Sequence, residues 1–358
     1  VRDTMDKMSD HHRKRRWRSL IAAVLSGALI VATAGGVGAG SEPCRVKNLD
    51  SGQRHSKLQS AVTAATSGDR IEVRGTCRGS TTIDRDLTVK GYWTRAWGRA
   101  RLEGTEVGTF VLTVKPGVSL TLKSTTAFAA RADRDGNGGG LLNRGTATLK
   151  SARVRGPSYA TAIVNEGSIT ISGTSDIGNV QNRGELTLGG QSSMDGRRQD
   201  YGPYSAGIYN EGLLALNGRS SIVDNRNDGV LNYGTVVLDG ESRIARNRRG
   251  VFNRGIVVMN DTGRVVHNDS TGIYIQLKGT LTMNDRSWVS HNEAPRGAGV
   301  FVRNGTLTMN DGSRIRYNRA RIEGGGLYVG NGTLFGVRRG PGGDANVRKN
   351  NPQDCFFE

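Results

Sequence analysis

The chain has 358 residues, and its composition already excludes several classes of protein. It contains 52 glycines but only 7 prolines, and 6% of its residues are aromatic. Short aliphatic and β-branched runs such as 306–309 recur along the chain, which argues against intrinsic disorder. No segment interleaves basic and aromatic residues as nucleic-acid-binding motifs do, so we expect no specific nucleic-acid binding.

The formal net charge is +18, and arginine carries most of it. Such a surface favours anionic partners, including acidic glycans and other wall or cell-surface polymers. The alternative is a charge pattern that merely keeps an edge-rich β protein soluble. Composition alone leaves both interpretations open.

Residues 1–39 have the pattern of an export signal. A basic segment at 13–18 precedes an apolar stretch that runs from Leu20 to Ala34, and Ala32-Thr33-Ala34 matches a cleavage site. The apolar stretch is short for a bilayer span. We therefore expect a secreted, extracellular or cell-surface protein without a membrane span after signal removal. The sequence leaves the general and twin-arginine export routes open.

The three cysteines fit an oxidising compartment. Cys44 and Cys77 flank the N-terminal segment, and a disulfide between them would close a loop there. Cys355 is the odd cysteine, so it is either free or displaces one partner of that pair.

Residues 40–70 read as an N-terminal cap. Leu58, Ala61, Val62 and Ala65 share one helical face, and Ser56 is placed to cap the helix start. A short amphipathic helix there would cover strand edges that are otherwise unpaired. A helix that binds a partner is the alternative.

Internal repetition dominates residues 71–340. Segment 207–212 (Gly-Ile-Tyr-Asn-Glu-Gly) has close copies at 229–234 and 250–255. The second glycine of this unit recurs roughly every 22 residues. Its positions are Gly145, Gly167, Gly184, Gly212, Gly234, Gly255, Gly279, Gly305 and Gly332.

Alternating strands follow these glycines, and a third short strand ends each unit. Leu214 and Leu216, like Val236 and Leu238, fall on one face, which is the period of a half-buried strand. Such a unit cannot bury its apolar face alone and must stack on its neighbours. Helical solenoids need longer apolar helices, and a β-propeller needs about twice this period.

Asparagines recur at two corners of the unit, where a side-chain amide can bond the backbone and its stacked counterparts. The first expected ladder comprises Asn143, Asn165, Asn182, Asn210, Asn232 and Asn253. It breaks where Ile275, Val302 and Val329 replace asparagine, so we expect the shape of the coils to change in the last three rungs. The second comprises Asn225, Asn247, Asn268, Asn292 and Asn318.

The sequence thus predicts an all-β protein, a single right-handed parallel β-helix with three sheets and a short N-terminal capping helix. Residues 71–340 would form the β-helix and 341–358 a C-terminal tail. Segments 207–210 and 325–328, followed by Gly-Thr-Leu-Thr-like strands, resemble those of bacterial secreted β-helix repeat proteins, including polymorphic-outer-membrane-protein-like and adhesin-like proteins of the pectin-lyase-like fold. The resemblance covers about residues 44–335 and implies the fold rather than a function.

One column of the repeat is a candidate binding surface. The residues that follow each inward Ile or Val should point outward, where aromatic rings can stack on sugars and arginines can pair with acidic groups. The alternative places this column in the core. Its members are Tyr209, Leu231, Phe252, Tyr274, Phe301 and Tyr328.

The longest insertion is a second candidate contact, against a merely tolerated loop. It carries Arg197, Arg198, Tyr201 and Tyr204.

A candidate metal site precedes the repeat, because Asp133, Asp135 and Asn137 match the first half of a calcium loop. Arg144 stands where the bidentate Glu of such a loop should be, so an ordinary polar turn is the alternative.

Catalytic signatures are missing from the sequence. Hydrolases of this fold carry Asn-Thr-Asp, Asp-Asp and Gly-His-Gly elements. None of these three elements occurs in this chain. His267 and His291 hold equivalent repeat positions and could hold a metal, or could reflect surface drift.

We therefore expect a monomeric, non-catalytic protein with no cofactor, apart from the calcium alternative. We expect it to bind an acidic or neutral polysaccharide or a cell surface through one sheet face. The alternatives are a polysaccharide lyase or glycoside hydrolase with an unrecognised site, and a purely structural envelope protein.

Overall fold

The computed structural model describes residues 43–92, 99–129, 138–156, 161–196, 206–339 and 345–358. All of them lie in the second of two compact units, Ser41–Glu358. The expected export signal, 1–39, lies outside the described residues. Within them, no helix is both long and apolar enough to cross a bilayer.

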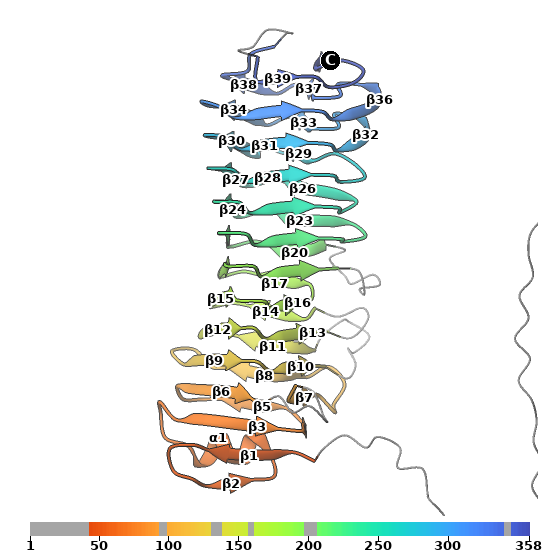
Figure 1. The fold of residues 1–358 in the computed structure, drawn as a ribbon. Coiled ribbons are helices and arrows are strands. Elements are labelled where there is room, and N and C mark those ends of the chain that lie inside the picture. Colours follow the sequence, from red (N-terminus) through yellow and green to blue (C-terminus); the bar gives the residue numbers. More distant parts are fainter. Residues whose placement is uncertain (1–42, 93–98, 130–137, 157–160, 197–205, 340–344) are drawn as a thin grey trace, which may run out of the picture. The chain divides into compact units, whose positions relative to one another are not determined.

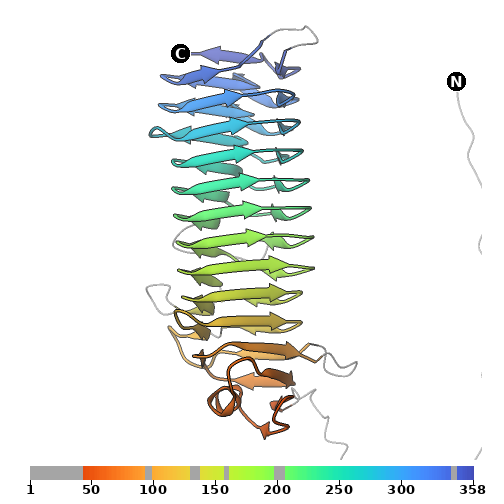
Figure 2. The same cartoon turned by 90° about the vertical axis from the view of Figure 1, so that its left-hand side faces the viewer.

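The second unit is a parallel β-helix whose coils stack one on another, as Figures 1 and 2 show. Each coil places one strand in each of three sheets, which we name A, B and C, in the chain order C, B, A. The predicted all-β fold with three parallel sheets and a short helix near the N-terminus is confirmed.

The strands of each sheet follow in the order in which they pair. Sheet A comprises β4 (Thr76–Arg78), β7 (Arg101–Glu103), β10 (Thr126–Phe128), β13 (Arg153–Arg155), β16 (Asp176–Ile177), β19 (Ser193–Asp195), β22 (Ser221–Val223), β25 (Arg243–Ala245), β28 (Arg264–Val266), β31 (Trp288–Ser290), β35 (Arg314–Arg316) and β39 (Val347–Arg348). Sheet B comprises β2 (Arg54–His55), β1 (Arg45–Asn48), β3 (Arg70–Arg74), β6 (Leu87–Gly91), β9 (Ser119–Lys123), β12 (Thr146–Lys150), β15 (Ser168–Ser172), β18 (Glu185–Leu188), β21 (Leu213–Leu216), β24 (Thr235–Leu238), β27 (Ile256–Met259), β30 (Thr280–Met283), β34 (Thr306–Met309) and β38 (Thr333–Phe335). Sheet C comprises β5 (Thr81–Ile83), β8 (Phe110–Val114), β11 (Gly139–Asn143), β14 (Ile163–Asn165), β17 (Val180–Asn182), β20 (Ala206–Asn210), β23 (Asp228–Asn232), β26 (Arg249–Asn253), β29 (Ile273–Gln276), β33 (Val300–Arg303), β37 (Leu327–Gly330) and β40 (Cys355–Phe357).

The core is a column of aliphatic side chains, and period-two alternation is the reason. In β21, Leu214 and Leu216 are fully buried while Leu213 and Ala215 are not. Leu214 is in register with Val236 of β24, and Val236 with Val257 of β27. Each inward residue therefore lies on its counterpart one rung away, which buries apolar surface continuously along the axis.

The N-terminal end is covered by the helix α1 (Leu58–Ala64) and by β1, which pairs antiparallel with both β2 and β3. Leu58, Ala61 and Val62 are buried, as the helical periodicity predicts. The expectation that Ser56 caps the helix is wrong. Lys57 is the N-cap residue, and no side chain caps the helix, because Ser56 lies one residue too early.

Cys44 and Cys77 form the predicted disulfide, with 4.5 Å between their Cα atoms. It ties the chain just before β1 to β4 of sheet A. Cys355 is a free thiol, so the alternative in which it displaces a partner is wrong.

Both asparagine ladders form inside the corners. In the first ladder, at the ends of the sheet C strands, Asn210 Nδ2 donates to Asn232 Oδ1 at 2.8 Å, and Asn232 Nδ2 donates to Asn253 Oδ1 at 2.8 Å. In the second ladder, after the sheet A strands, Asn225 Nδ2 donates to Asn247 Oδ1 at 2.8 Å and Asn247 to Asn268 at 3.1 Å. These side chains are buried, so the ladders satisfy polar groups that water cannot reach.

The last coils differ from the rest, as the end of the first ladder predicts. Ile275 takes the place of asparagine beside Asn253, and the turn that follows carries Leu277 and Lys278 at positive φ. An additional two-stranded sheet, β32 (Glu293–Arg296) and β36 (Arg319–Glu323), lies beside this end.

The coil stack also continues beyond its predicted end. Residues 341–358 were expected to be a tail, but β39 and β40 extend sheets A and C there. The second asparagine ladder extends with them, because Asn318 Nδ2 donates to Asn350 Oδ1 at 3.1 Å.

Cys355 should react slowly in the folded protein. Burial in the last coil is the main reason that the pKa of its thiol rises to about 12. Because only the thiolate is nucleophilic, we expect iodoacetamide to modify Cys355 at pH 8 at least about 100-fold more slowly in the native protein than in urea. Mass spectrometry of timed samples measures this, and equal rates in the two conditions would contradict the burial.

Candidate functional site: arginines and a tryptophan on sheet A

The predicted aromatic column faces outward on sheet C. Ile208, Val251 and Ile273 are fully buried, whereas Tyr209, Phe252 and Tyr274, which follow them, are half-buried. The alternative that placed this column in the core does not describe these three residues. Tyr328, at the C-terminal end, is only 5% exposed.

From Phe252 to Tyr328 the rings of this column stack on one another, whereas Tyr209 lies beside Tyr233, with ring centroids 5.6 Å apart. Ring centroids lie 5.3 Å apart for Phe252 and Tyr274, 4.9 Å for Tyr274 and Phe301, and 4.5 Å for Phe301 and Tyr328. Phe356 of β40 continues the stack 5.1 Å from Tyr328. The faces of these rings are therefore largely used by their neighbours, and a sugar would meet mainly ring edges.

Polar groups near both ends of this ring stack reinforce it. The guanidinium of Arg249 lies 4.4 Å from the Phe252 ring centroid and is itself paired with Asp228 at 2.7 Å. At the other end, Tyr328 Oη donates to Glu358 at 3.1 Å, and burial together with that carboxylate raises the pKa of Tyr328. These contacts show that the rings stabilise the fold by stacking. That the column binds a ligand stays a prediction.

Two sets of predicted site residues lie outside the described residues. They are Arg197, Arg198, Tyr201 and Tyr204 of the long insertion, and Asp133, Asp135 and Asn137 of the half calcium loop. Among the residues that the structure does describe, no group of three His, Cys, Asp or Glu side chains is arranged to hold a metal.

His267 and His291 stack with their ring centroids 4.9 Å apart and their planes 10° apart. Burial, with the neighbouring His267 and Arg316, lowers the pKa of His291. Parallel stacking holds the ring nitrogens of the two residues about one rung apart, farther than two ligands of one zinc ion at about 2.1 Å each would allow. The pair therefore stacks rather than forming a ready metal site.

Acidic and basic groups meet at one corner after sheet A. Arg246 donates to both carboxylate oxygens of Asp224 at 2.9 Å, and Asp195 is close enough to raise the pKa of Arg246 further. The two-point ion pair occupies the Asp224 carboxylate. In this arrangement Asp224 serves as the counter-ion of Arg246.

Sheet A carries a second outward column, which the sequence analysis did not single out. The outward residues that precede each inward Ile, Val or Met are in register from rung to rung. In chain order they are Ser193, Ser221, Arg243, Arg264, Trp288 and Arg314. We call these six residues the sheet A column.

A groove of about 380 Å³ runs along the first part of this column. Its walls include Ser193, Ser221, Arg243 and Arg264, and the ion pair between Arg219 and Glu241, 2.9 Å long, lies at its edge. The hydroxyl of Ser221 donates to that of Ser193 at 3.3 Å. The groove thus combines the hydroxyl of Ser193, which can still donate, with the guanidinium groups of Arg243 and Arg264.

Arg243 and Arg264 lie in register on neighbouring rungs. Within the described chain, neither forms an ion pair or a side-chain hydrogen bond. Burial is the first cause that lowers the pKa of Arg243, and the positive charges of Arg246 and Arg264 follow, while the carboxylate of Asp224 acts in the opposite direction. Of the three arginines that line the groove, Arg219 is paired with Glu241, and Arg243 and Arg264 are in no ion pair within the described chain.

Trp288 stands between arginines in the same column. The guanidinium groups of Arg264 and Arg316 each lie 5.7 Å from its ring centroid. Trp288 also packs against an apolar cluster of Val223, Ala245 and Val266. An aromatic surface framed by guanidinium groups can contact the apolar face of a sugar while the arginines pair with its acidic groups.

A sequence signal for this column exists. Each member directly precedes the inward residue of the third strand, as in Arg243-Ile244 and Trp288-Val289. The members lie more than 20 residues apart in sequence, so only the register of the coils brings them together.

In comparisons with known proteins, no family model, no curated protein and no solved structure matches the chain.

Proposed function

We propose that the protein is an exported, non-catalytic β-helix protein that binds an acidic polysaccharide or a comparable cell-surface polymer through sheet A. The observation that carries the proposal is the pair of in-register, unpaired arginines, Arg243 and Arg264, followed by Trp288 in the same column. Secretion, and the kinship with adhesin-like secreted β-helix proteins, are parts of the same proposal and derive from the export-signal pattern and the repeat.

The chemistry of the column favours a carboxylated or sulfated sugar chain. Guanidinium groups bind carboxylates and sulfates through two parallel hydrogen bonds, and the Ser193 hydroxyl adds a neutral donor. Successive rungs are about 4.8 Å apart, so the column presents its groups at regular intervals to an extended polymer. A long flat sheet suits such a ligand better than a compact one.

Binding should depend strongly on the two unpaired arginines. The Arg243→Gln/Arg264→Gln double variant should bind polygalacturonate at least about 10-fold more weakly than the wild type, because it loses charge-assisted hydrogen bonds of about 1.5–3 kcal/mol each. Isothermal titration calorimetry measures the affinity, with a neutral glucan as the comparison ligand.

A matched control removes two arginines that already have acidic partners. Arg144 and Arg183 pair with Glu166 and Glu211 at 2.9 and 3.0 Å, so Arg144→Gln/Arg183→Gln changes the net charge equally. This control should change affinity less than about 3-fold. The same loss in both double variants, or no binding of an acidic polymer by the wild type, would contradict the proposal.

A further inference from the structure

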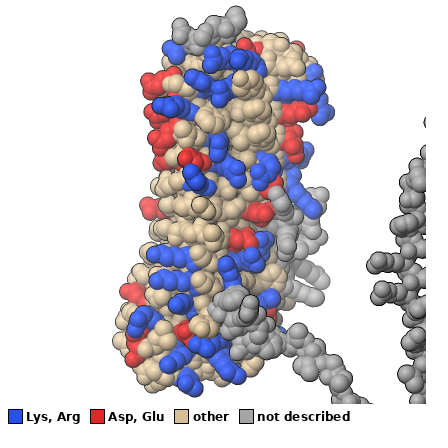
Figure 3. Space-filling model, viewed as in Figure 1, with Lys and Arg blue, Asp and Glu red and all other residues tan. Residues whose placement is uncertain are grey.

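A second basic surface lies on sheet B, on the outward side of its first strands. Lys47 of β1, Glu72 of β3, Lys90 of β6, Lys123 of β9 and Lys150 of β12 are in register on successive strands. Three of the lysines are therefore direct neighbours, one per rung. In Figure 3, Lys and Arg side chains gather over this lower part of the molecule.

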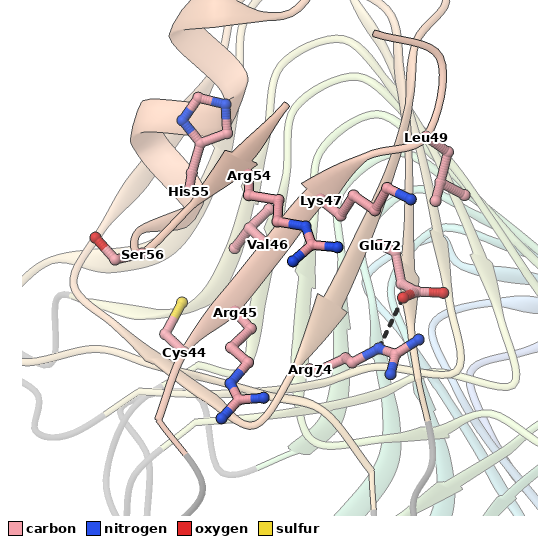
Figure 4. Close-up of a pocket in the computed structure, with 10 residues that line it drawn as sticks. All are labelled: Cys44, Arg45, Val46, Lys47, Leu49, Arg54, His55, Ser56, Glu72 and Arg74. Carbon is pink, nitrogen blue, oxygen red and sulfur yellow. Dashed lines mark hydrogen bonds and ion pairs between the residues drawn. The ribbon is translucent and has the colours of Figure 1, made fainter. Parts of the chain in front are cut away.

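Arginines extend this surface at the N-terminal end. Arg45 is in register with Arg74, and Lys47 with Arg54. Together with neighbouring residues they line a pocket of about 560 Å³. Figure 4 shows the side chains of Arg45, Lys47, Arg54 and Arg74 on one side of β1, β2 and β3. We call these four residues, with Lys90, Lys123 and Lys150, the N-terminal basic face.

The acidic charge on this face is already used. Glu72 lies 2.8 Å from Arg74, and it is the acidic residue of the column. Within the described chain, Lys90, Lys123 and Lys150 form no ion pair. On other faces of this β-helix some cations pair with an acid on a neighbouring rung, as Arg183 does with Glu211.

In-register like charges cost folding free energy, so this row needs a compensating ligand or counter-ions. The sheet A column differs in chemistry, since it combines arginines with tryptophan and serine. The lysines here are compact point charges, which suit phosphate groups. At the end of the row Arg74 is held by Glu72, and the forks of Arg45 and Arg54 suit a terminal phosphate.

We propose that the N-terminal basic face binds a linear phosphate polymer, with the lysine row along the chain and the arginine-lined pocket at one end. This site is separate from the sheet A column and does not rest on the function proposed for it. Because binding releases counter-ions from the polymer, affinity falls steeply as salt rises.

The test uses the full-length protein and inorganic polyphosphate as the probe. The Lys123→Gln/Lys150→Gln double variant should bind polyphosphate at least about 10-fold more weakly, with a shallower salt dependence. Its melting temperature should stay the same or rise, because a like-charge pair is removed. Lys115→Gln/Lys278→Gln, which removes two exposed lysines elsewhere, should change affinity less than about 3-fold.

The outcomes separate this proposal from its competitors. No polyphosphate binding by the wild type, equal losses in both double variants, or a lowered melting temperature of Lys123→Gln/Lys150→Gln would each overturn it. So would tighter binding of single-stranded DNA than of polyphosphate at equal phosphate number. Polygalacturonate affinity should be unchanged in Lys123→Gln/Lys150→Gln and reduced in Arg243→Gln/Arg264→Gln, so the two sites fail or succeed independently.

Discussion

Gly234→Ala should lower the free energy of unfolding by at least about 3 kcal/mol. A Cβ atom on Gly234 would meet the carbonyl oxygen of Gly212 on the previous rung, with carbon and oxygen of Glu211 only 2.7 Å away. Backbone atoms of a stacked coil cannot move aside as a flexible side chain can. The repeated glycine is therefore required by close contact between rungs, and not by an unusual backbone angle.

Gly189→Ala is the matched control for this substitution. The nearest atom to a Cβ there is the carbonyl oxygen of Ile171 at 3.8 Å, an ordinary van der Waals contact. Urea denaturation followed by circular dichroism measures both variants. The control should change stability by less than about 1 kcal/mol, and a similar small effect for Gly234→Ala would show that rungs tolerate a methyl group at this corner.

Asn232→Ala should cost about 2–4 kcal/mol, because it breaks a buried ladder at its centre. Asn232 Nδ2 lies within hydrogen-bonding distance of Asn253 Oδ1 and of two backbone carbonyls, and its Oδ1 accepts from Asn210. The side chain is fully buried, so water cannot replace these bonds without opening the corner.

An outer asparagine ladder provides the control. Asn310 Nδ2 donates to Asn284 Oδ1 at 2.9 Å, but Asn310 is exposed and water can take over its bond. Asn310→Ala should therefore cost less than about 1 kcal/mol in the same denaturation experiment. Equal costs for Asn232→Ala and Asn310→Ala would mean that burial does not set the strength of the inner ladder.

The fold could be predicted because each of its determinants repeats. Alternation marks Leu214 and Leu216 as inward, and Asn210, Asn232 and Asn253 recur at one corner, so a few copies suffice to identify both patterns. The last coil was not predicted, because it lacks one of these repeated features. Asn350 and Phe356 continue a ladder and a stack, but no copy of the glycine turn precedes them to reveal it.

The candidate site was less predictable, because register rather than local sequence creates it. Arg243 and Arg264 become neighbours only when the lengths of the intervening turns are known. Alternation shows that Phe252 and Tyr274 point outward, but side-chain torsions decide that their rings face each other instead of a ligand. Lys90 and Lys123 likewise align only through the strand pairing.

The most direct test of the account is to incubate the purified protein with polygalacturonate and to follow both binding and polymer length by size-exclusion chromatography. We predict that the polymer elutes with the protein and keeps its original length, and that Arg243→Gln/Arg264→Gln abolishes the co-elution. Release of shortened sugar chains would contradict a non-catalytic role, and co-elution that persists in the variant would contradict the assignment of sheet A as the binding face.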